Sequence, residues 1–371
     1  MKKIIQNYDY MLLFNIFALF FIGILALASA TNYDVNGFTN KLKVQIASFI
    51  LGFIVMIIVS IIDYKKYANL YILIYFLGII ALLLVYVPGL GTVQFGARSW
   101  IRIKSINFQT SEIVKIIYVI VIAKVLDKYK EGLNSFTDLI PIFLISAPYF
   151  VLIYKQPDLG NMLVFLFIVI GMLFESKLSY KIILKSFILF LISLPILYFN
   201  LNDYQKNRIN EFLNPTDLSN SAYFHRYMSE ITIGSGKLFG SGLFQGGFSS
   251  NKYLPVQESD FIFAVWVENT GFVGGMVLIF LYFLFMSKLI YIAFNARDRI
   301  GTYITIGILF MFMYNIIENI SMTIGLMPIT GVTLPFISYG GSSILINMIA
   351  VGLVLNVSLR SKLNKNKEYL A

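Results

Sequence analysis

MLLFNIFALFFIGILALAS, residues 11–29, decides the fold class, because this uncharged apolar run has the length of a membrane-spanning helix. The hydrocarbon core of a bilayer is about 30 Å thick, and a helix needs roughly 20 mostly apolar residues to cross it. Lys2 and Lys3 precede the run, and no convincing small-residue cleavage pattern accompanies it. We therefore expect a retained membrane helix rather than a signal peptide that is removed.

Similar apolar stretches recur along the rest of the chain. They are expected at residues 44–62, 68–87, 110–126, 138–154, 159–175, 181–200, 261–287, 302–324 and 341–360. Together with the first run, they predict an all-α integral membrane protein with ten transmembrane helices. No fixed-period repeat, low-complexity tract or separate soluble region interrupts the pattern, so residues 1–371 are interpreted as one membrane domain.

The composition places the protein in lipid and restricts its chemistry. Hydrophobic residues make up 58% of the chain and charged residues 13%, which is more apolar surface than a soluble domain of this length buries. The absence of cysteine excludes disulfides, thiolate metal sites and a cysteine nucleophile. The single histidine, His225, makes a histidine-based zinc site or a Ser/His/Asp triad a poor candidate.

The net charge of +10 reflects membrane topology better than nucleic-acid binding. The basic residues are scattered over short loops between apolar runs and do not cluster on a polar domain. Most of them lie in loops on the side that both termini share, and short loops rich in Lys and Arg are typically cytoplasmic. We expect a multi-pass protein with both termini in the cytoplasm and no nucleic-acid partner.

Irregular segments gather on the opposite, extracytoplasmic face. Residues 88–109, 155–158, 201–260 and 325–340 are rich in Gly, Pro and charge. The longest of them, about residues 201–260, is expected to form a large extracytoplasmic loop between the seventh and eighth helices. Long loops in a compact bundle are usually functional, so we expect the active face on this side.

Charged residues at the starts of predicted helices are candidate site residues, because an ionisable group costs roughly 2.5–3.5 kcal/mol at the centre of a membrane helix. Glu112 and Lys115 are spaced i, i+3, which places them on one helical face as an ion pair. A structural role and a functional role suit this spacing equally. Asp158 follows Pro157 in a typical helix start, where a capping role is commoner than a catalytic one.

Asp260 ends the long loop, directly before an apolar helix. Its place at the membrane boundary suits a general base, because desolvation strengthens a carboxylate as a proton acceptor, although the helix N-terminus acts in the opposite direction. The alternative is an N-cap supplied by Ser259 or Asp260. For three other ionisable residues, internal polar pairing is favoured over catalysis: Glu268, Glu318 and His225.

Gly-rich segments and basic residues accompany these positions. Residues 233–236, 240–242 and 338–343 contain the glycines, which suit either a phosphate cradle or tight helix packing. Several basic residues have the chemistry to complement a pyrophosphate on a lipid carrier: Arg98, Arg102, Lys104, Lys155, Arg208, Arg226 and Lys237.

These segments, in their order along the chain, resemble the SEDS family, which contains RodA, FtsW and SpoVE. The resemblance covers nearly the whole chain, and the overall length and short N-terminus are closer to RodA than to FtsW. The motifs that carry it are GARSWI at 96–101, FQTSE at 108–112 with Lys115, QPDLG at 156–160, Arg208 with FLNP at 212–215 and Asp217, IGSG at 233–236, DFIFA at 260–264 with Glu268, and LPFISYGGSS at 334–343.

The resemblance implies a peptidoglycan glycosyltransferase of the bacterial cell membrane that polymerises lipid II during elongation and shape maintenance. It implies release of undecaprenyl pyrophosphate, a class B penicillin-binding protein as partner, and contacts with elongation-complex membrane proteins and membrane lipids. Asp260 matches the essential loop aspartate of the family. The cavity and substrate-binding candidates are Glu112, Lys115, Asp158, Arg98, Arg208, Lys155, Ser338 and Gly340. A divalent cation, magnesium or manganese, is expected by analogy alone, since no metal-ligand spacing is visible.

The chain also departs from the family pattern. Members often have Arg at the position of Ser99, Pro at that of Thr110 and Gln at that of Met228. They often carry a Pro-Glu-x-His-Thr-Asp run where this chain has PVQESD at 255–260, so Val256 and Glu258 differ. The alternatives are a lipid II flippase, an FtsW-like role in division, and a non-catalytic scaffold that would tolerate loss of Asp260.

Overall fold

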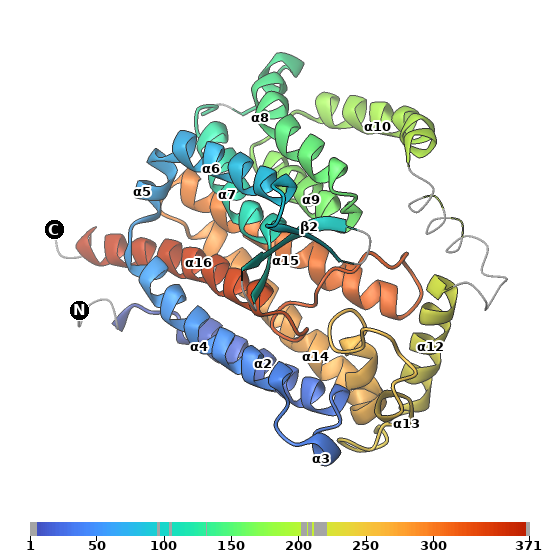
Figure 1. The fold of residues 1–371 in the computed structure, drawn as a ribbon. Helices are drawn as coiled ribbons and strands as arrows, with labels where there is room; N and C mark the ends of the chain where they lie inside the picture. The colour runs from blue at the N-terminus through green and yellow to red at the C-terminus, as the bar shows by residue number, and fades with distance from the viewer. Residues whose placement is uncertain are drawn as a thin grey trace.

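The computed structural model describes residues 6–94, 97–103, 106–130, 132–201, 206, 210 and 221–368. Each of the expected apolar stretches contains one long helix (Figure 1). These helices are α2 (Tyr10–Ala30), α4 (Asn40–Ile61), α6 (Tyr71–Leu83), α7 (Thr110–Leu126), α8 (Phe136–Lys155), α9 (Leu159–Glu175), α10 (Tyr180–Asn200), α14 (Ile262–Phe294), α15 (Arg299–Thr323) and α16 (Gly341–Glu368). Arg208 and Lys104 lie outside the described residues.

Within the described part of the chain, six of these helices are long and apolar enough to cross a membrane: α2, α4, α8, α14, α15 and α16. Two shorter apolar helical segments, Tyr71–Tyr86 and Leu159–Glu175, accompany them. The protein is therefore a helical, multi-pass membrane protein. The remaining helices lie in the connections between these: α3 (Tyr33–Asn36), α5 (Tyr64–Asn69), the 3-10 helix η1 (Leu84–Tyr86), α12 (Ser221–Ser235) and α13 (Gly247–Ser250).

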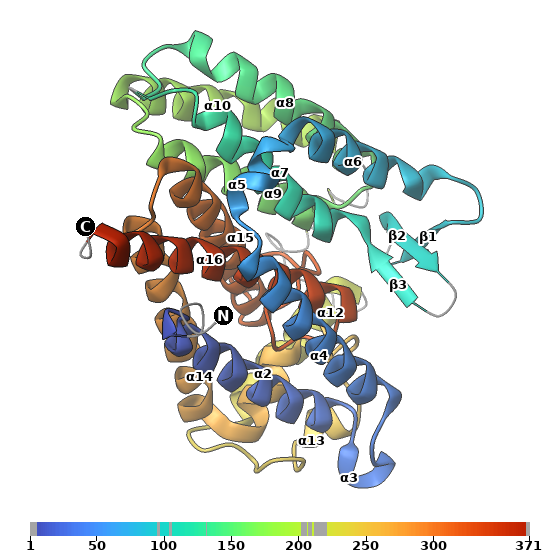
Figure 2. The same cartoon turned by 90° about the vertical axis from the view of Figure 1, so that its left-hand side faces the viewer.

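The expectation of an all-α protein was wrong in one segment. A three-stranded antiparallel sheet, β1 (Gly91–Gln94), β2 (Ala97–Ile103) and β3 (Ile106–Gln109), lies between α6 and α7. It projects from the end of the bundle that lies opposite the C-terminal end of α16 (Figure 2). Residues of β2 alternate in burial, with Ser99 and Ile101 buried and Arg102 exposed, which is the period of a half-buried strand.

Helices α15 and α16 form the centre of the bundle. Helix α15 packs against α7, α9 and α14, and α16 packs mainly against α4. Most of the apolar surface of α15 and α16 is buried inside the protein, whereas α8 exposes Phe143 and Leu144 on a largely uncovered face. A helix that is apolar all round is either central or lipid-facing, so α15 and α16 are the core and α8 faces lipid.

Helix α14 is broken at Gly271, where φ is 72° and ψ is −171°. The Gly-rich segment before α14 supplies hydrogen-bond partners to the backbone groups on both sides of this break. The N–H groups of Phe272 and Val273 donate to the carbonyls of Lys237 and Leu238, at 2.9 and 3.1 Å. The N–H of Ser241 donates to the carbonyl of Glu268, and that of Gly242 to the carbonyl of Asn269.

Backbone groups inside a membrane protein must be satisfied internally, which explains why the chain lies so close to the break. A Cβ at Gly240 would lie 2.1 Å from the carbonyl oxygen of Asn269, and one at Gly236 would lie 2.2 Å from that of Val267. Gly236 and Gly240 therefore serve close packing, which was one of the two expected roles, and the N–H groups of Ser241 and Gly242 are occupied by carbonyls of α14.

Candidate active site

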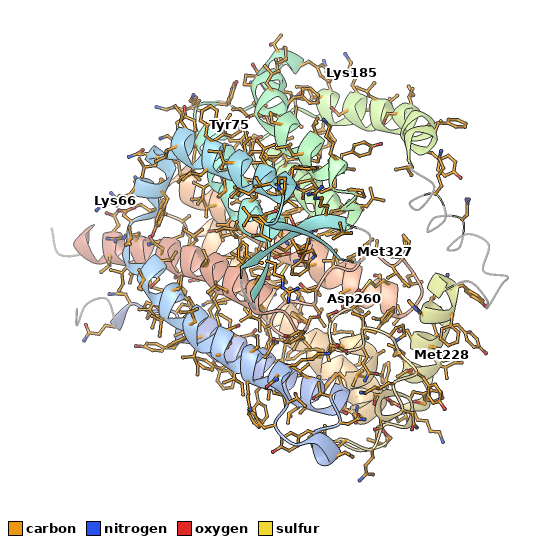
Figure 3. The ribbon with its side chains drawn as sticks, viewed as in Figure 1. Lys66, Tyr75, Lys185, Met228, Asp260 and Met327 are labelled. Carbon is orange, nitrogen blue, oxygen red and sulfur yellow. The ribbon has the colours of Figure 1, made fainter. Side chains whose placement is uncertain are left out.

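Asp260 lies half-buried in the turn that precedes α14, in the middle of the view in Figure 3. Its N–H donates to the carbonyl of Val256 at 3.2 Å, and Ser259 Oγ donates to Asp260 Oδ1 at 2.8 Å. The N-cap of α14 is Phe261, without any side-chain capping bond. The capping alternative placed the N-cap at Ser259 or Asp260, whereas the N-cap lies at Phe261, directly after Asp260.

The backbone around Asp260 is fixed through three consecutive carbonyl groups. The carbonyl of Glu258 accepts the N–H of Tyr339 at 2.8 Å, and that of Ser259 accepts Ser338 Oγ at 2.6 Å. The carbonyl of Asp260 accepts Asn319 Nδ2 at 3.1 Å. Because all three donors belong to α15 and the following loop, the C-terminal part of the bundle sets the position of Asp260.

Gln45 of α4 holds the other side of this arrangement. Its Nε2 donates to the carbonyl of Ser338 at 2.9 Å, and its Oε1 accepts the N–H of Gly340 at 3.2 Å. The side chain of Gln45 is fully buried. Ser338 and Gly340, which were candidate substrate contacts, thus have protein partners, and their observed contacts position the turn that carries Asp260.

The start of α9 reaches the same region through the loop that follows α15. A Cβ at Gly160 would lie 2.8 Å from Cγ2 of Val332, and one at Gly331 would lie 3.5 Å from Oδ2 of Asp260. The QPDLG segment and Asp260 therefore lie on the two sides of residues 330–332. This loop is also tied to α15, where Thr330 Oγ1 donates to Glu318 Oε1 at 2.8 Å.

Asp158 caps α9, as the sequence predicted. Its Oδ1 accepts the N–H of Asn161 at 3.2 Å, and its Oδ2 accepts Asn161 Nδ2 at 2.8 Å. Gln109 Nε2, at the end of β3, also donates to Oδ2 at 3.0 Å. A capping carboxylate that accepts three hydrogen bonds is well satisfied, so Asp158 joins the sheet to the start of α9.

Glu112 and Lys115 form the expected ion pair in the first turns of α7. Lys115 Nζ lies 2.7 Å from Glu112 Oε1, and both residues are buried. Two buried charges are tolerated because each neutralises the other. Removal of one partner would leave the other as an unpaired charge in the bundle.

The remaining basic candidates occupy different surroundings. Arg98 Nε on β2 donates to the carbonyl of Val85 at 3.2 Å, and its guanidinium lies 5.8 Å from the ring centre of Tyr86. The sheet is therefore attached to η1. Lys155 is exposed in the last turn of α8, two residues from Pro157.

Internal pairing was the correct interpretation of Glu268 and Glu318. Glu268 accepts the N–H groups of Phe248 and Ser249 at 2.7 and 3.0 Å, which holds α13 against α14. Glu318 accepts the hydroxyl of Thr330. His225 on α12 packs edge-on against Phe261, with the ring centres 6.5 Å apart, so it lies near the turn of Asp260.

Sequence reasoning missed Gln45, Asn319 and Lys41, which hold the turn around Asp260. The signal for the first two was present, because an amide within a predicted membrane helix is costly unless it has partners. Their partners lie far away in the sequence, so the pairing itself was invisible. Among the described residues, no group of three His, Asp or Glu side chains is arranged to hold a metal ion.

The FtsW/RodA/SpoVE family model, described as cell cycle protein, matches residues 10–363. The chain belongs to this family. Among its relatives is the probable peptidoglycan glycosyltransferase FtsW of Geobacter metallireducens, 34% identical over 97% of each chain. The peptidoglycan glycosyltransferase MrdB of Escherichia coli K12 is 32% identical over 96% of this chain and 94% of its own.

A solved structure has the same fold. It comes from a study of how a peptidoglycan synthase complex coordinates polymerization and crosslinking. Its matching chain is 28% identical, has a TM-score of 0.82, and aligns over 95% of this chain and 98% of its own. The family model spans FtsW, RodA and SpoVE together. MrdB is the RodA-type relative, and it is about as similar to this chain as the FtsW relative is. The choice of RodA over FtsW therefore stays a prediction.

Proposed function

We propose that this protein is a peptidoglycan glycosyltransferase that polymerises lipid II into glycan strands, with Asp260 as general base. Family membership and relatives that carry this activity in their names support the reaction class. The observation that carries the role of Asp260 is its geometry. It is a half-buried carboxylate directly before the N-cap of α14, in a turn whose three carbonyls, at Glu258, Ser259 and Asp260, are all held in place.

In the proposed reaction, Asp260 accepts the proton of the sugar 4-hydroxyl of the acceptor lipid II. The oxygen then forms a bond to the anomeric carbon of the donor's muramyl sugar, with inversion, while the bond from that carbon to the pyrophosphate oxygen breaks. Undecaprenyl pyrophosphate leaves as an anion, and Asp260 later returns its proton to solvent. A general base in this position contributes about 10²–10⁴-fold to the rate.

The leaving pyrophosphate needs charge neutralisation more than it needs a proton. Lys155, Arg98 and Arg208 are the proposed sources of positive charge. A divalent cation, magnesium or manganese, stays part of the proposal by family analogy, and it would supply additional neutralisation of the pyrophosphate.

The proposed topology has ten spans, cytoplasmic termini and an extracytoplasmic active face. The distribution of Lys and Arg over short loops supports this orientation. The loop between α10 and α14, which ends at Asp260, then lies outside the cell. The proposed partner is a class B penicillin-binding protein that cross-links the product, which is consistent with the synthase complex among the structural relatives. We assign the elongation role on the resemblance to RodA.

The test is polymer formation from purified lipid II by the purified protein, with and without its penicillin-binding partner. Wild type and Asp260→Ala are compared at matched folding. We expect glycan strands from the wild type and none from the variant. Lipid II movement across vesicles without polymer would instead support a flippase, and polymer unchanged by the substitution would remove Asp260 as base.

A further inference from the structure

An ion pair joins α4 to the turn that carries Asp260. Lys41, in the first turn of α4, pairs with Glu258, two residues before Asp260. The Nζ of Lys41 also lies 5.9 Å from the ring centre of Tyr339, whose N–H bonds the carbonyl of Glu258. The pair therefore links three segments: α4, the turn before α14, and the turn before α16.

The backbone of this turn is strained, and that strain makes side-chain anchors necessary. Val256 has a φ of 51°, in the left-handed region, which a β-branched residue rarely adopts. Its carbonyl accepts the N–H groups of both Ser259 and Asp260, at 3.1 and 3.2 Å. The conformation of Val256 thus sets the direction in which Asp260 leaves the turn, and such a conformation persists only where its surroundings hold it.

The two residues that follow Val256 supply the holding contacts. Gln257 is buried, and its Nε2 donates to the carbonyls of Ala30 and Ser249, at 2.7 and 3.0 Å. Glu258 is held by its ion pair with Lys41. These anchors run to the ends of α2 and α4 and to α13, whereas the carbonyl anchors described above run to α15 and the loop that follows it.

The pair also borders a cavity of about 440 Å³ at this corner. The cavity is lined by polar side chains that include Thr31, Thr39 and Lys252, together with Lys41 and Glu258. Lys41 therefore has two conceivable partners, Glu258 and an anionic group of a substrate. The observed contact favours Glu258, because its carboxylate is already paired with the ammonium group of Lys41.

We propose that Lys41 is a positioning residue for Asp260: through Glu258, it holds the strained Val256 turn in the conformation that aims the carboxylate. This inference rests on the proposed function of Asp260 as base. It assigns to α4, which carries no reacting group, the task of fixing the catalytic turn from the side opposite to α15.

The first experiment measures polymerisation kinetics in Lys41→Met and Glu258→Gln. We expect both variants to lower kcat by about 10-fold, since small displacements of a catalytic group have effects of this size or larger. KM should change less than twofold. The matched control is Lys43→Met, which removes an exposed lysine two residues away on the same helix and should leave both constants unchanged.

The decisive variant exchanges the two charges, as Lys41→Glu with Glu258→Lys. If the pair acts through positioning, the exchange restores most of kcat. If Lys41 instead binds an anionic group of the substrate, the exchange raises KM further and restores nothing, which would overturn the proposal.

Hydrogen–deuterium exchange of residues 256–261 supplies a readout that does not depend on glycosyl transfer. We expect faster exchange in Lys41→Met, and wild-type protection in the charge-exchanged protein. Unchanged exchange in Lys41→Met would contradict the proposal even if activity fell. If the wild type makes no polymer while exchange responds as expected, the proposed function fails and the structural link from Lys41 to the turn stands.

Discussion

The two ends of the helical bundle are held together by different chemistry. At the Asp260 end, buried amides and hydroxyls bond to backbone groups, as Gln45, Asn319 and Ser338 do, beside the Lys41–Glu258 ion pair. At the end that carries Asp9, Asp63 and Asp298, several ion pairs join the helices. They are Asp9 with Lys288 and Lys362, Asp63 with Arg360, and Lys65 with Asp298.

The contacts at the two ends differ in how strictly they fix geometry. Hydrogen bonds from buried amides are directional. A buried polar group that loses its hydrogen-bond partner costs its full desolvation free energy, so these bonds define a single geometry. At the other end, the pairs of Asp63 with Arg360 and of Lys65 with Asp298 join partly exposed side chains, and such pairs tolerate a range of angles and each contribute little to the free energy of unfolding. The Asp260 end is thus built for geometric accuracy, whereas the other end is built to keep helices together.

The largest expected effect is at the break in α14. Gly271→Ala places a methyl group 2.4 Å from the backbone of Leu238 and Gly240, at a φ of 72°. We expect a loss of about 3 kcal/mol or more in the free energy of unfolding, because both strain and overlap oppose the side chain. Thermal unfolding in detergent measures it.

Gly275→Ala is the matched control, because its added Cβ would lie 3.1 Å from the tip of Val267 inside regular helix. It should cost much less. If the two variants unfold at the same temperature, the break does not need the close approach of the Gly-rich segment.

The next effect is at Gln45. Gln45→Leu leaves the buried carbonyl of Ser338 without its partner, at about 1–3 kcal/mol, and also removes the acceptor for the part-buried N–H of Gly340. We expect lower thermal stability together with a lower kcat, since the turn at Asp260 loses its support. Gln45→Glu keeps the acceptor for Gly340 and should fall between wild type and Gln45→Leu. Full activity in Gln45→Leu would show that the buried amide is not needed for geometry.

The smallest effect is expected at Asp298, at the other end. Burial raises the pKa of Asp298, but hydrogen bonds from Lys65, the Gly301 N–H and Tyr64 outweigh it, so the pKa lies below its ordinary value. A carboxyl whose pKa is lowered by folding stabilises the protein above its unfolded pKa, and this contribution disappears as the pH falls through the folded pKa.

Asp298→Asn keeps the N-cap of α15 and removes the charge. At pH 7 we expect a loss of about 1 kcal/mol after screening by solvent, with unchanged kcat and KM. The stability difference from wild type should be constant from pH 8 to about pH 5 and shrink below about pH 4. A difference that grows at low pH would reverse this assignment.

Local patterns predicted the helices and the short-range pairs. Apolar runs of membrane-spanning length located each long helix, the i, i+3 spacing predicted the Glu112–Lys115 pair, and the Pro157 start predicted the cap at Asp158. Each of these depends on residues within one helix or one turn, so the sequence contains all the information.

The sheet and the contacts that Gln45, Asn319 and Ser338 make around Asp260 could not be predicted in the same way. The strands are short and pair only within a loop, and the alternation of β2 was overlooked among Gly and charged residues. Gln45 and Ser338 are separated by 293 positions, and Asn319 and Asp260 by 59. The alternative of an N-cap at Ser259 or Asp260 missed the observed N-cap, Phe261, because distant residues such as Asn319 and Ser338 fix where this turn ends.

The most direct test of the central claim is the pH dependence of kcat for wild type and Asp260→Asn, with purified lipid II and the penicillin-binding partner. Asparagine is nearly isosteric with aspartate but cannot take the proton. We predict at least a 100-fold loss of kcat, unchanged thermal stability, and loss of the acidic limb of the wild-type profile. Wild-type kcat with the acidic limb intact in Asp260→Asn would contradict this prediction.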